Sequence, residues 1–217
     1  MFLQKMQNLS YFNWTSWLNS RIIKNNDLNK LRGYMEKYPS ISYNINRSSD
    51  FYCFDKIDGS NIRVEWSRKK EFCKFGTRSR LLDETDLQFS DVPSLAVRDF
   101  EQQVSDIAKK ERVERMTLFF EYFGPNSFAG NHQDDDTKTL TLLDVSIHKR
   151  GIISPKEFIN LFGNLNIAQC LYRGKVGESL IRAVRNRTLD GMTFEGIVCK
   201  ANNPKRPGYP IMFKVKS

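Results

Sequence analysis

The chain has 217 residues, of which 40% are hydrophobic and 12% aromatic, and its formal net charge is +9. This length favours one sizeable domain, or one domain with a small appendage, and the composition supplies enough apolar residues for a core, which excludes global disorder. A globular protein this basic usually binds a polyanion such as nucleic acid, although charge that serves only solubility is the alternative.

The sequence contains no segment that predicts insertion into a membrane, although the basic charge would also suit an anionic membrane surface or a phosphorylated ligand. No apolar run is long enough to span a bilayer, and the N-terminus lacks the apolar core of a signal peptide. The four cysteines are scattered without metal-ligand spacing, a pattern typical of buried thiols, at Cys53, Cys73, Cys170 and Cys199. We therefore expect no membrane partner and a reducing compartment, either cytoplasmic or nuclear.

The first part of the chain is predicted to be helical. Apolar residues recur at helical spacing over residues 12–37, and Tyr38-Pro39 ends that pattern because proline restricts the residue before it. We therefore assign residues 1–37 to an N-terminal helical extension and residues 38–217 to the main domain.

Strands dominate the main domain. Residues 51–57 and 60–66 are predicted to pair as a hairpin around Asp58-Gly59, because Asp-Gly is a favoured turn dipeptide. Later patterns predict strands at 71–78, 116–123, 139–147, 193–200 and 210–216, and helices at 94–114, 154–162 and 175–188. Interleaved antiparallel strands with few helices predict an α+β fold.

Lys56-Ile57-Asp58-Gly59 is the most informative motif, because it places an amine at the end of a predicted strand. A lysine amine acts as a nucleophile only after it loses its proton, and nearby positive charge and burial favour that neutral form. Such an amine can attack phosphorus and hold a nucleotide covalently. Alone, the tetrapeptide is weak evidence, because a solvated lysine at an ordinary hairpin has the same pattern.

Three further motifs follow in the order Phe120-Glu121-Tyr122-Phe123-Gly124, Glu195-Gly196-Ile197-Val198-Cys199-Lys200 and Lys214-Val215-Lys216. They supply carboxylates suited to Mg²⁺ or ribose hydroxyls and cations suited to phosphates. Each alone is also typical of a charged residue on a strand edge. Together with Lys56, and in this order, they resemble motifs I, III, IV and V of the covalent nucleotidyltransferases, the superfamily of polynucleotide ligases and mRNA capping enzymes.

The resemblance implies a ligase-type nucleotidyltransferase domain, with antiparallel sheets flanked by helices, over residues 38–217. It implies that Lys56 is the catalytic nucleophile that becomes lysyl-AMP, and that Glu195 and Glu121 bind Mg²⁺. The residues implied to contact ATP are Asp58, Gly59, Asn61, Glu121, Leu143, Lys200, Lys214 and Lys216. Leu143 stands where the family usually has an aromatic residue that stacks on the base.

Within the superfamily, the details resemble the nick-sealing RNA ligases. Asn61 stands five positions after Lys56, where DNA ligases and capping enzymes usually carry arginine. Thr77-Arg78-Ser79-Arg80 resembles the arginine element of the RNA ligases, so Arg78 and Arg80 are implied to contact nucleic-acid phosphates. The segment 36–41 resembles the stretch upstream of the nucleophile. The resemblance thus implies an ATP-dependent RNA ligase that acts on RNA or an RNA-containing nicked duplex in nucleic-acid repair.

Three other functions stay open at this point, and a capping guanylyltransferase is one of them. A minimal ATP-dependent DNA ligase would share the same motifs apart from Asn61, and a non-catalytic nucleic-acid-end binding module could use the same fold. A further domain usually follows motif V in the family, whereas this chain ends after Lys216-Ser217. Two interpretations stay open: a minimal enzyme, or an isolated catalytic domain whose complete strand joining would need a C-terminal domain or a protein partner outside this chain.

Overall fold

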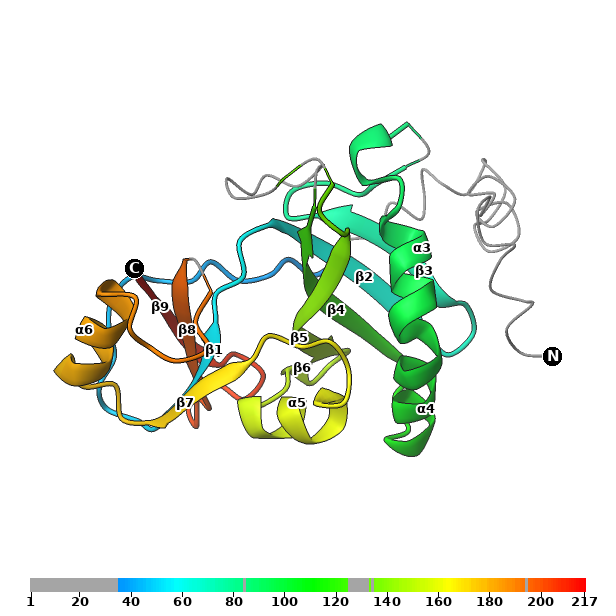
Figure 1. Cartoon of the computed structure of the whole chain (residues 1–217). Helices are drawn as coiled ribbons and strands as arrows, with labels where there is room; N and C mark the ends of the chain where they lie inside the picture. The colour runs from blue at the N-terminus through cyan, green and yellow to red at the C-terminus, as the bar shows by residue number, and fades with distance from the viewer. Residues whose placement is uncertain (1–34, 84, 125–132, 134, 194) are drawn as a thin grey trace.

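The structure, a computed structural model, describes residues 35–83, 85–124, 133, 135–193 and 195–217, and its strands form two antiparallel sheets (Figure 1). The large sheet has the order β3-β2-β4-β5-β6, and the small sheet has the order β7-β1-β8-β9. The strands are β1 (Phe51–Asp55), β2 (Ser60–Ser67), β3 (Glu71–Thr77), β4 (Arg115–Phe123), β5 (Thr139–Ile147), β6 (Gly151–Ile152), β7 (Cys170–Gly174), β8 (Gly196–Ala201) and β9 (Ile211–Lys216).

One long helical segment covers the large sheet. It runs through α3 (Val92–Ala96), a π-helical turn (Val97–Glu101) and α4 (Gln102–Lys110), after a short 3-10 turn at Leu87–Phe89. The amphipathic pattern predicted this helix because its apolar positions face β4, where the rings of Phe100 and Phe120 meet edge to face with centroids 4.9 Å apart.

Helix α6 (Glu178–Arg185) covers the outer side of the small sheet, at the left of Figure 1. Its buried residues Leu180, Ile181 and Val184 pack in one apolar cluster with Phe51 and Phe213 of the sheet. The arginines of the same helix lie on its exposed face, as the sequence pattern predicted.

Helix α5 (Pro155–Phe162) begins where the sequence indicated, because Ser154 caps it by accepting a hydrogen bond from the Glu157 amide and proline stands in its first turn. Phe158 of this helix packs edge to face against Phe54 of β1, with ring centroids 6.1 Å apart. Residues of α5 therefore join the large core cluster and reach β1 of the small sheet.

The predicted hairpin at 51–57 and 60–66 is wrong. β1 pairs with β7 and β8 in the small sheet, whereas β2 pairs with β3 and β4 in the large sheet, so the residues between them cross from one sheet to the other. Both strands are buried along nearly their whole length, and each lies between two partner strands inside its own sheet. The Asp-Gly dipeptide indicates a change of direction but does not say which strands pair.

Other predictions met mixed outcomes. The α+β fold is confirmed, and the remaining predicted strands and helices are present with boundaries shifted by a few residues. The edge strands β6 and β7 were not predicted. Of the helix predicted at 12–37, the described residues 35–37 have no regular secondary structure, and the earlier ones lie outside the described residues. None of the helices in the described part is long and apolar enough to cross a membrane.

The loop between β8 and β9 is fastened to β6 of the other sheet. The Ile152 amide donates a hydrogen bond to the Gly208 carbonyl over 2.9 Å. Gly208 has a φ of +82°, and a Cβ atom there would lie 2.1 Å from the Arg150 carbonyl oxygen. Only glycine accepts both this conformation and this close approach, so Gly208 holds the far ends of the two sheets together.

Gly208→Ala should therefore destabilise the protein by roughly 1–3 kcal/mol, because it adds both left-handed strain and a clash with backbone. Gly177→Ala is the matched control, since nothing lies within 4 Å of a Cβ atom at that position. The control should cost only about 0.5 kcal/mol through weaker helix capping. Urea unfolding followed by circular dichroism measures both, and equal losses would contradict the role of the loop contact.

Candidate active site

Lys56 lies in the short connection that leaves the small sheet and enters the large one. Its backbone amide donates to the Gly196 carbonyl over 3.0 Å, and the preceding Asp55 amide donates to the Gln169 carbonyl over 2.8 Å. The buried Asp55 carboxylate accepts two further hydrogen bonds from Thr193, at 3.0 Å from its amide and 2.8 Å from its hydroxyl. The backbone of the predicted nucleophile is therefore fixed on both sides.

Two glycines of the predicted motifs are required by close backbone contacts. A Cβ atom on Gly59 would lie 2.5 Å from the Tyr122 carbonyl oxygen, so the connection can pass β4 only with glycine there. Gly196 has a φ of +120°, and its Cβ atom would lie 2.1 Å from the Val215 carbonyl oxygen. These glycines bring the Lys56 connection against β4 and bring β8 against β9.

The Lys56 ammonium forms an ion pair with Glu195, and both side chains are about one fifth exposed. The other carboxylate oxygen of Glu195 accepts a hydrogen bond from Lys216 Nζ at 3.1 Å. Although burial opposes it, these hydrogen bonds from Lys56 and Lys216 hold the pKa of Glu195 below its ordinary value. The bond to Glu195 likewise raises the pKa of Lys216. Glu195 is thus an ionised carboxylate shared by two lysines.

Glu121, the second predicted acidic residue, lies on β4 in a different electrostatic environment. Burial raises its pKa from 4.5 to about 7; Lys56 lowers this value, while the negative charges of Glu195 and Asp58 raise it. Glu121 is therefore close to half protonated at neutral pH, and added positive charge would favour its ionised form. The structure thus brings Lys56, Asp58, Glu121 and Glu195 into one cluster.

A cavity of about 290 Å³ opens between the two sheets beside Lys56. Its apolar lining includes Ile41, Phe54, Leu143, Ala168 and Val198, and its polar lining includes Lys56, Asn61, Arg78, Glu121, Lys200 and Lys214. An apolar slot with a few converging polar groups is the usual form of a small-ligand site. Leu143 presents an aliphatic surface there, as its sequence position predicted.

Asn61 has one hydrogen-bonding atom with no partner in the described part of the chain. Its Nδ2 donates to the Phe120 carbonyl over 3.2 Å. Its buried Oδ1 accepts no hydrogen bond. Because a buried oxygen without a donor is unfavourable, Asn61 offers an acceptor that a ligand in the cavity can satisfy.

Lys200 is almost fully buried and is held by the protein itself. Its Nζ donates to Asp144 Oδ2 at 2.7 Å and to the Leu143 carbonyl at 2.8 Å. The Tyr38 hydroxyl donates to the same carboxylate oxygen. Burial, and then the charge of Asp144, raise the pKa of Tyr38 well above its ordinary value. Lys200 therefore borders the cavity as part of a buried Tyr38–Asp144–Lys200 network.

Sequence reasoning missed Tyr38 and Asp144 as site residues. Tyr38 lies in the segment 36–41 whose resemblance was noted, but no individual side chain was singled out there. Asp144 follows Leu143 on β5 and is only 2% exposed. A carboxylate in the middle of the predicted strand, directly after Leu142-Leu143 and before Val145, is the signal that could have identified it, because such a group is rarely buried without a cation.

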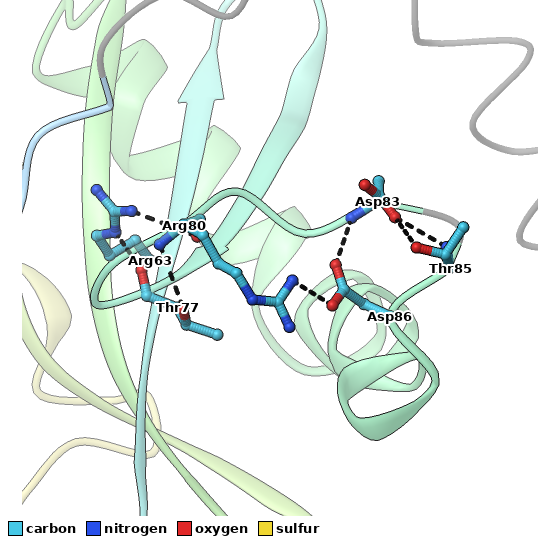
Figure 2. Close-up of polar contacts among 6 residues, drawn as sticks. All are labelled: Arg63, Thr77, Arg80, Asp83, Thr85 and Asp86. Atoms are coloured by element: carbon cyan, nitrogen blue, oxygen red, sulfur yellow. Dashed lines mark hydrogen bonds and ion pairs between the residues drawn. The ribbon is translucent and has the colours of Figure 1, made fainter.

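The two arginines of the predicted phosphate-binding element point to different places. Arg78 lines the cavity, and its Nη2 donates to Ser40 Oγ over 3.0 Å. Arg80 instead forms an ion pair with Asp86 (Figure 2). It is not among the residues that line the cavity. Buried Arg63 braces the same turn, since its Nε donates to the Thr77 carbonyl over 2.7 Å.

Comparison with known proteins assigns the family. The sequence model of the RNA ligase family matches residues 49–216. The chain therefore belongs to the RNA ligase family. No curated protein matches the chain in sequence.

Solved structures of an RNA ligase from Naegleria gruberi share the fold. A variant of that enzyme without ligand is 18% identical with a TM-score of 0.61, and the match covers 84% of this chain and 56% of that one. A variant solved with ATP and Mn is 16% identical with a TM-score of 0.61. The enzyme solved with PPi is 16% identical with a TM-score of 0.60. This chain thus covers little more than half the length of the Naegleria ligase.

The raised pKa of Glu121 predicts a pH-dependent effect of Glu121→Gln. The folded protein binds this proton more tightly than the unfolded chain, so wild-type stability falls as pH rises from 4.5 towards about 7. The neutral glutamine avoids that loss, and in EDTA the variant should be more stable than wild type by about 2–3 kcal/mol at pH 8.

The matched control is Glu111→Gln, at an exposed position after α4, which should change stability by less than about 0.5 kcal/mol at either pH. Urea unfolding at pH 5 and pH 8 gives all the values. If Glu121→Gln gained no more at pH 8 than at pH 5, the carboxyl would not be the proton-binding group described.

Proposed function

We propose that this protein is an ATP-dependent RNA ligase in which Lys56 carries the nucleotide. The Lys56 nitrogen attacks the α-phosphorus of ATP, a nitrogen–phosphorus bond forms, and the bond to the β-phosphate breaks to release pyrophosphate. AMP then passes to the 5′-phosphate of an RNA strand, and a 3′-hydroxyl displaces AMP to join the ends. The observation that carries the proposal is Lys56 fixed beside a cavity of about 290 Å³ and ion-paired with Glu195.

The side chains around Lys56 match the charges of this reaction. Glu195 accepts a hydrogen bond from the Lys56 amine, so a carboxylate is in contact with the atom that must lose a proton. Lys214 lines the cavity and Lys216 binds the other oxygen of Glu195, and in this proposal these two cations stabilise the developing phosphate charge. The apolar lining, with Leu143 on one wall, would receive the base.

A divalent cation such as Mg²⁺ fits the acidic groups of the site. Glu121, Glu195 and Asp58 interact electrostatically around Lys56. Among the described residues, no group of three or more His, Cys, Asp or Glu could hold a metal unaided. Mg²⁺ commonly uses one or two carboxylates together with substrate phosphates, so Glu195 and Glu121 would hold it with ATP. When bound, the ion would neutralise phosphate charge and assist departure of pyrophosphate.

The first test is formation of the covalent adduct. Protein incubated with ATP and Mg²⁺ should gain the mass of AMP by mass spectrometry, whereas GTP and NAD should give no comparable product. Lys56→Ala should gain nothing, because it lacks the nucleophile. Lys69→Ala, in the exposed turn after β2, is the matched lysine control and should react like wild type. An unmodified wild-type protein would favour a non-catalytic end-binding module.

The second test separates Arg78 from Arg80. Arg78 lines the cavity, so Arg78→Ala should slow AMP transfer from adenylylated protein, which carries AMP on Lys56, to a 5′-phosphorylated RNA. The expected loss is roughly a hundredfold, which is the cost of removing one electrostatic contact in other enzymes. Arg80→Ala is the matched control and should slow it only a few-fold, because Arg80 is engaged by Asp86. Equal losses would mean that the turn, rather than the Arg78 side chain, is what matters.

The choice between RNA and DNA is tested with the same adenylylated protein. Matched nicked duplexes should carry either ribose or deoxyribose at the 3′-hydroxyl end, since the 2′-hydroxyl is the main group that separates RNA from DNA. Faster sealing of the ribose-containing nick supports the RNA ligase. Equal or faster sealing of the all-DNA nick would favour the minimal DNA ligase. Normal formation of lysyl-AMP without sealing of either nick would indicate that joining needs a partner or a further domain.

A further inference from the structure

Tyr43 is an exposed aromatic residue beside the lysines of the active site. Among the described residues, the large hydrophobic side chains that stay exposed are Tyr43, Leu87 and Tyr209, and Tyr43 is 61% exposed. The Nζ atom of Lys214 lies 4.3 Å from the centre of the Tyr43 ring, within cation–π distance. Lys214 also lines the cavity, so the ring stands at the edge of the proposed nucleotide site.

The backbone beside Tyr43 is held in place. Ser42 forms a parallel bridge with Phe213 on β9, and the Lys214 amide donates to the Ser42 carbonyl over 2.9 Å. The Ser42 hydroxyl in turn accepts from the Asn44 amide at 2.9 Å. Tyr43 therefore lies in a segment that pairs with the edge strand of the small sheet. Its side chain is exposed although the backbone beside it is held by hydrogen bonds.

Tyr43 also lies near the second lysine of the pair. Tyr43 is among the groups that interact electrostatically with Lys216, although the hydrogen bond and charge of Glu195 are the larger causes of the raised pKa of Lys216. Lys216 is bonded to Glu195, and Glu195 is paired with Lys56. The exposed ring therefore lies against Lys214 and within electrostatic range of Lys216, which shares Glu195 with Lys56.

The geometry of phosphoryl transfer says which ligand reaches this position. Attacking and leaving groups lie roughly in line on opposite sides of phosphorus. Pyrophosphate therefore leaves the α-phosphorus on the side opposite Lys56. In the next step Lys56 is itself the leaving group, so the 5′-phosphate must enter from the side that pyrophosphate vacated. On the proposed function, Lys214 and Lys216 serve that side.

We propose that Tyr43 stacks on the base of the 5′-terminal nucleotide of the RNA strand that receives AMP. The inference rests on the proposed function and adds the residue that recognises the polynucleotide end. A nick or free end leaves one face of that base without a covalently linked neighbour, and an exposed phenol beside the phosphate-binding lysines can cover it. Stacking of a base on an aromatic side chain tolerates any sequence, which suits an enzyme that joins ends of varied sequence.

The experiment compares Tyr43→Ala and Tyr43→Phe with Tyr209→Ala. Tyr209 is the matched control because it is 62% exposed, and Arg206 lies over its ring at 4.6 Å, but it lies in the β8–β9 loop. Each protein is first adenylylated, so that it carries AMP on Lys56. It is then mixed with 5′-phosphorylated RNA that begins with adenosine or with an abasic residue, and single-turnover AMP transfer is followed. A third RNA carries 2-aminopurine at its 5′ end, so that stacking is read from fluorescence quenching without turnover.

With the adenosine end, Tyr43→Ala should lower the efficiency of AMP transfer by roughly ten- to a hundredfold, while Tyr43→Phe and Tyr209→Ala should stay within about twofold of wild type. With the abasic end, Tyr43→Ala and wild type should become equal. Tyr43→Ala should also lose the 2-aminopurine quenching that wild type shows.

Three results would overturn the inference. Tyr43→Ala could match wild type on the adenosine end, or it could lose as much on the abasic end. It could also slow formation of lysyl-AMP as strongly as AMP transfer, which would make Tyr43 only a support for Lys214. A wild-type protein that forms no lysyl-AMP would instead refute the proposed function. The stacking contact would still be supported in that case if wild type without AMP quenched 2-aminopurine and Tyr43→Ala did not.

Discussion

The passage of the chain from the small sheet to the large sheet is the constraint on which the site depends. Lys56 lies in that passage, Gly59 is pressed against the Tyr122 carbonyl, and Gly196 allows β8 to approach β9. Because β1 and β2 belong to different sheets, Lys56, the proposed nucleophile, lies where the cavity between them opens. A hairpin at the same residues would have left the lysine on a surface turn without such a cavity.

Beside Lys56 lie two carboxylates whose pKa values are shifted in opposite directions. Glu195 has a lowered pKa because it accepts hydrogen bonds from two lysines. Glu121 has a raised pKa because it is buried and faces the other carboxylates. Before a ligand binds, the cluster therefore contains one firmly ionised acid and one that responds to added positive charge. In the proposed reaction, this difference in pKa suits a site that binds ATP together with a metal ion and then releases pyrophosphate.

A second, buried network ties the start of the described chain to the cavity wall. Tyr38 and Lys200 both donate to Asp144, and Lys200 is only 2% exposed. Removing one partner from such a pair leaves a buried charge uncompensated, which typically costs about 3–5 kcal/mol. The network makes Lys200 a wall of the cavity, whereas Lys214 and Lys216 are the lysines left accessible to phosphates. Exposed Tyr43 lies beside these two.

The sequence alone determined the features that depend on local residue type and spacing. These were the Lys56 motif and its companions, the helix start at Ser154-Pro155, the amphipathic helix over the large sheet and the α+β class. Only the tertiary structure decided that β1 and β2 separate, that Arg78 faces the cavity while Arg80 pairs with Asp86, and that Tyr38 meets Asp144 across 106 positions. Strand pairing, burial and charge state depend on contacts between residues that are distant in the chain. The local spacing of apolar residues does not specify those contacts.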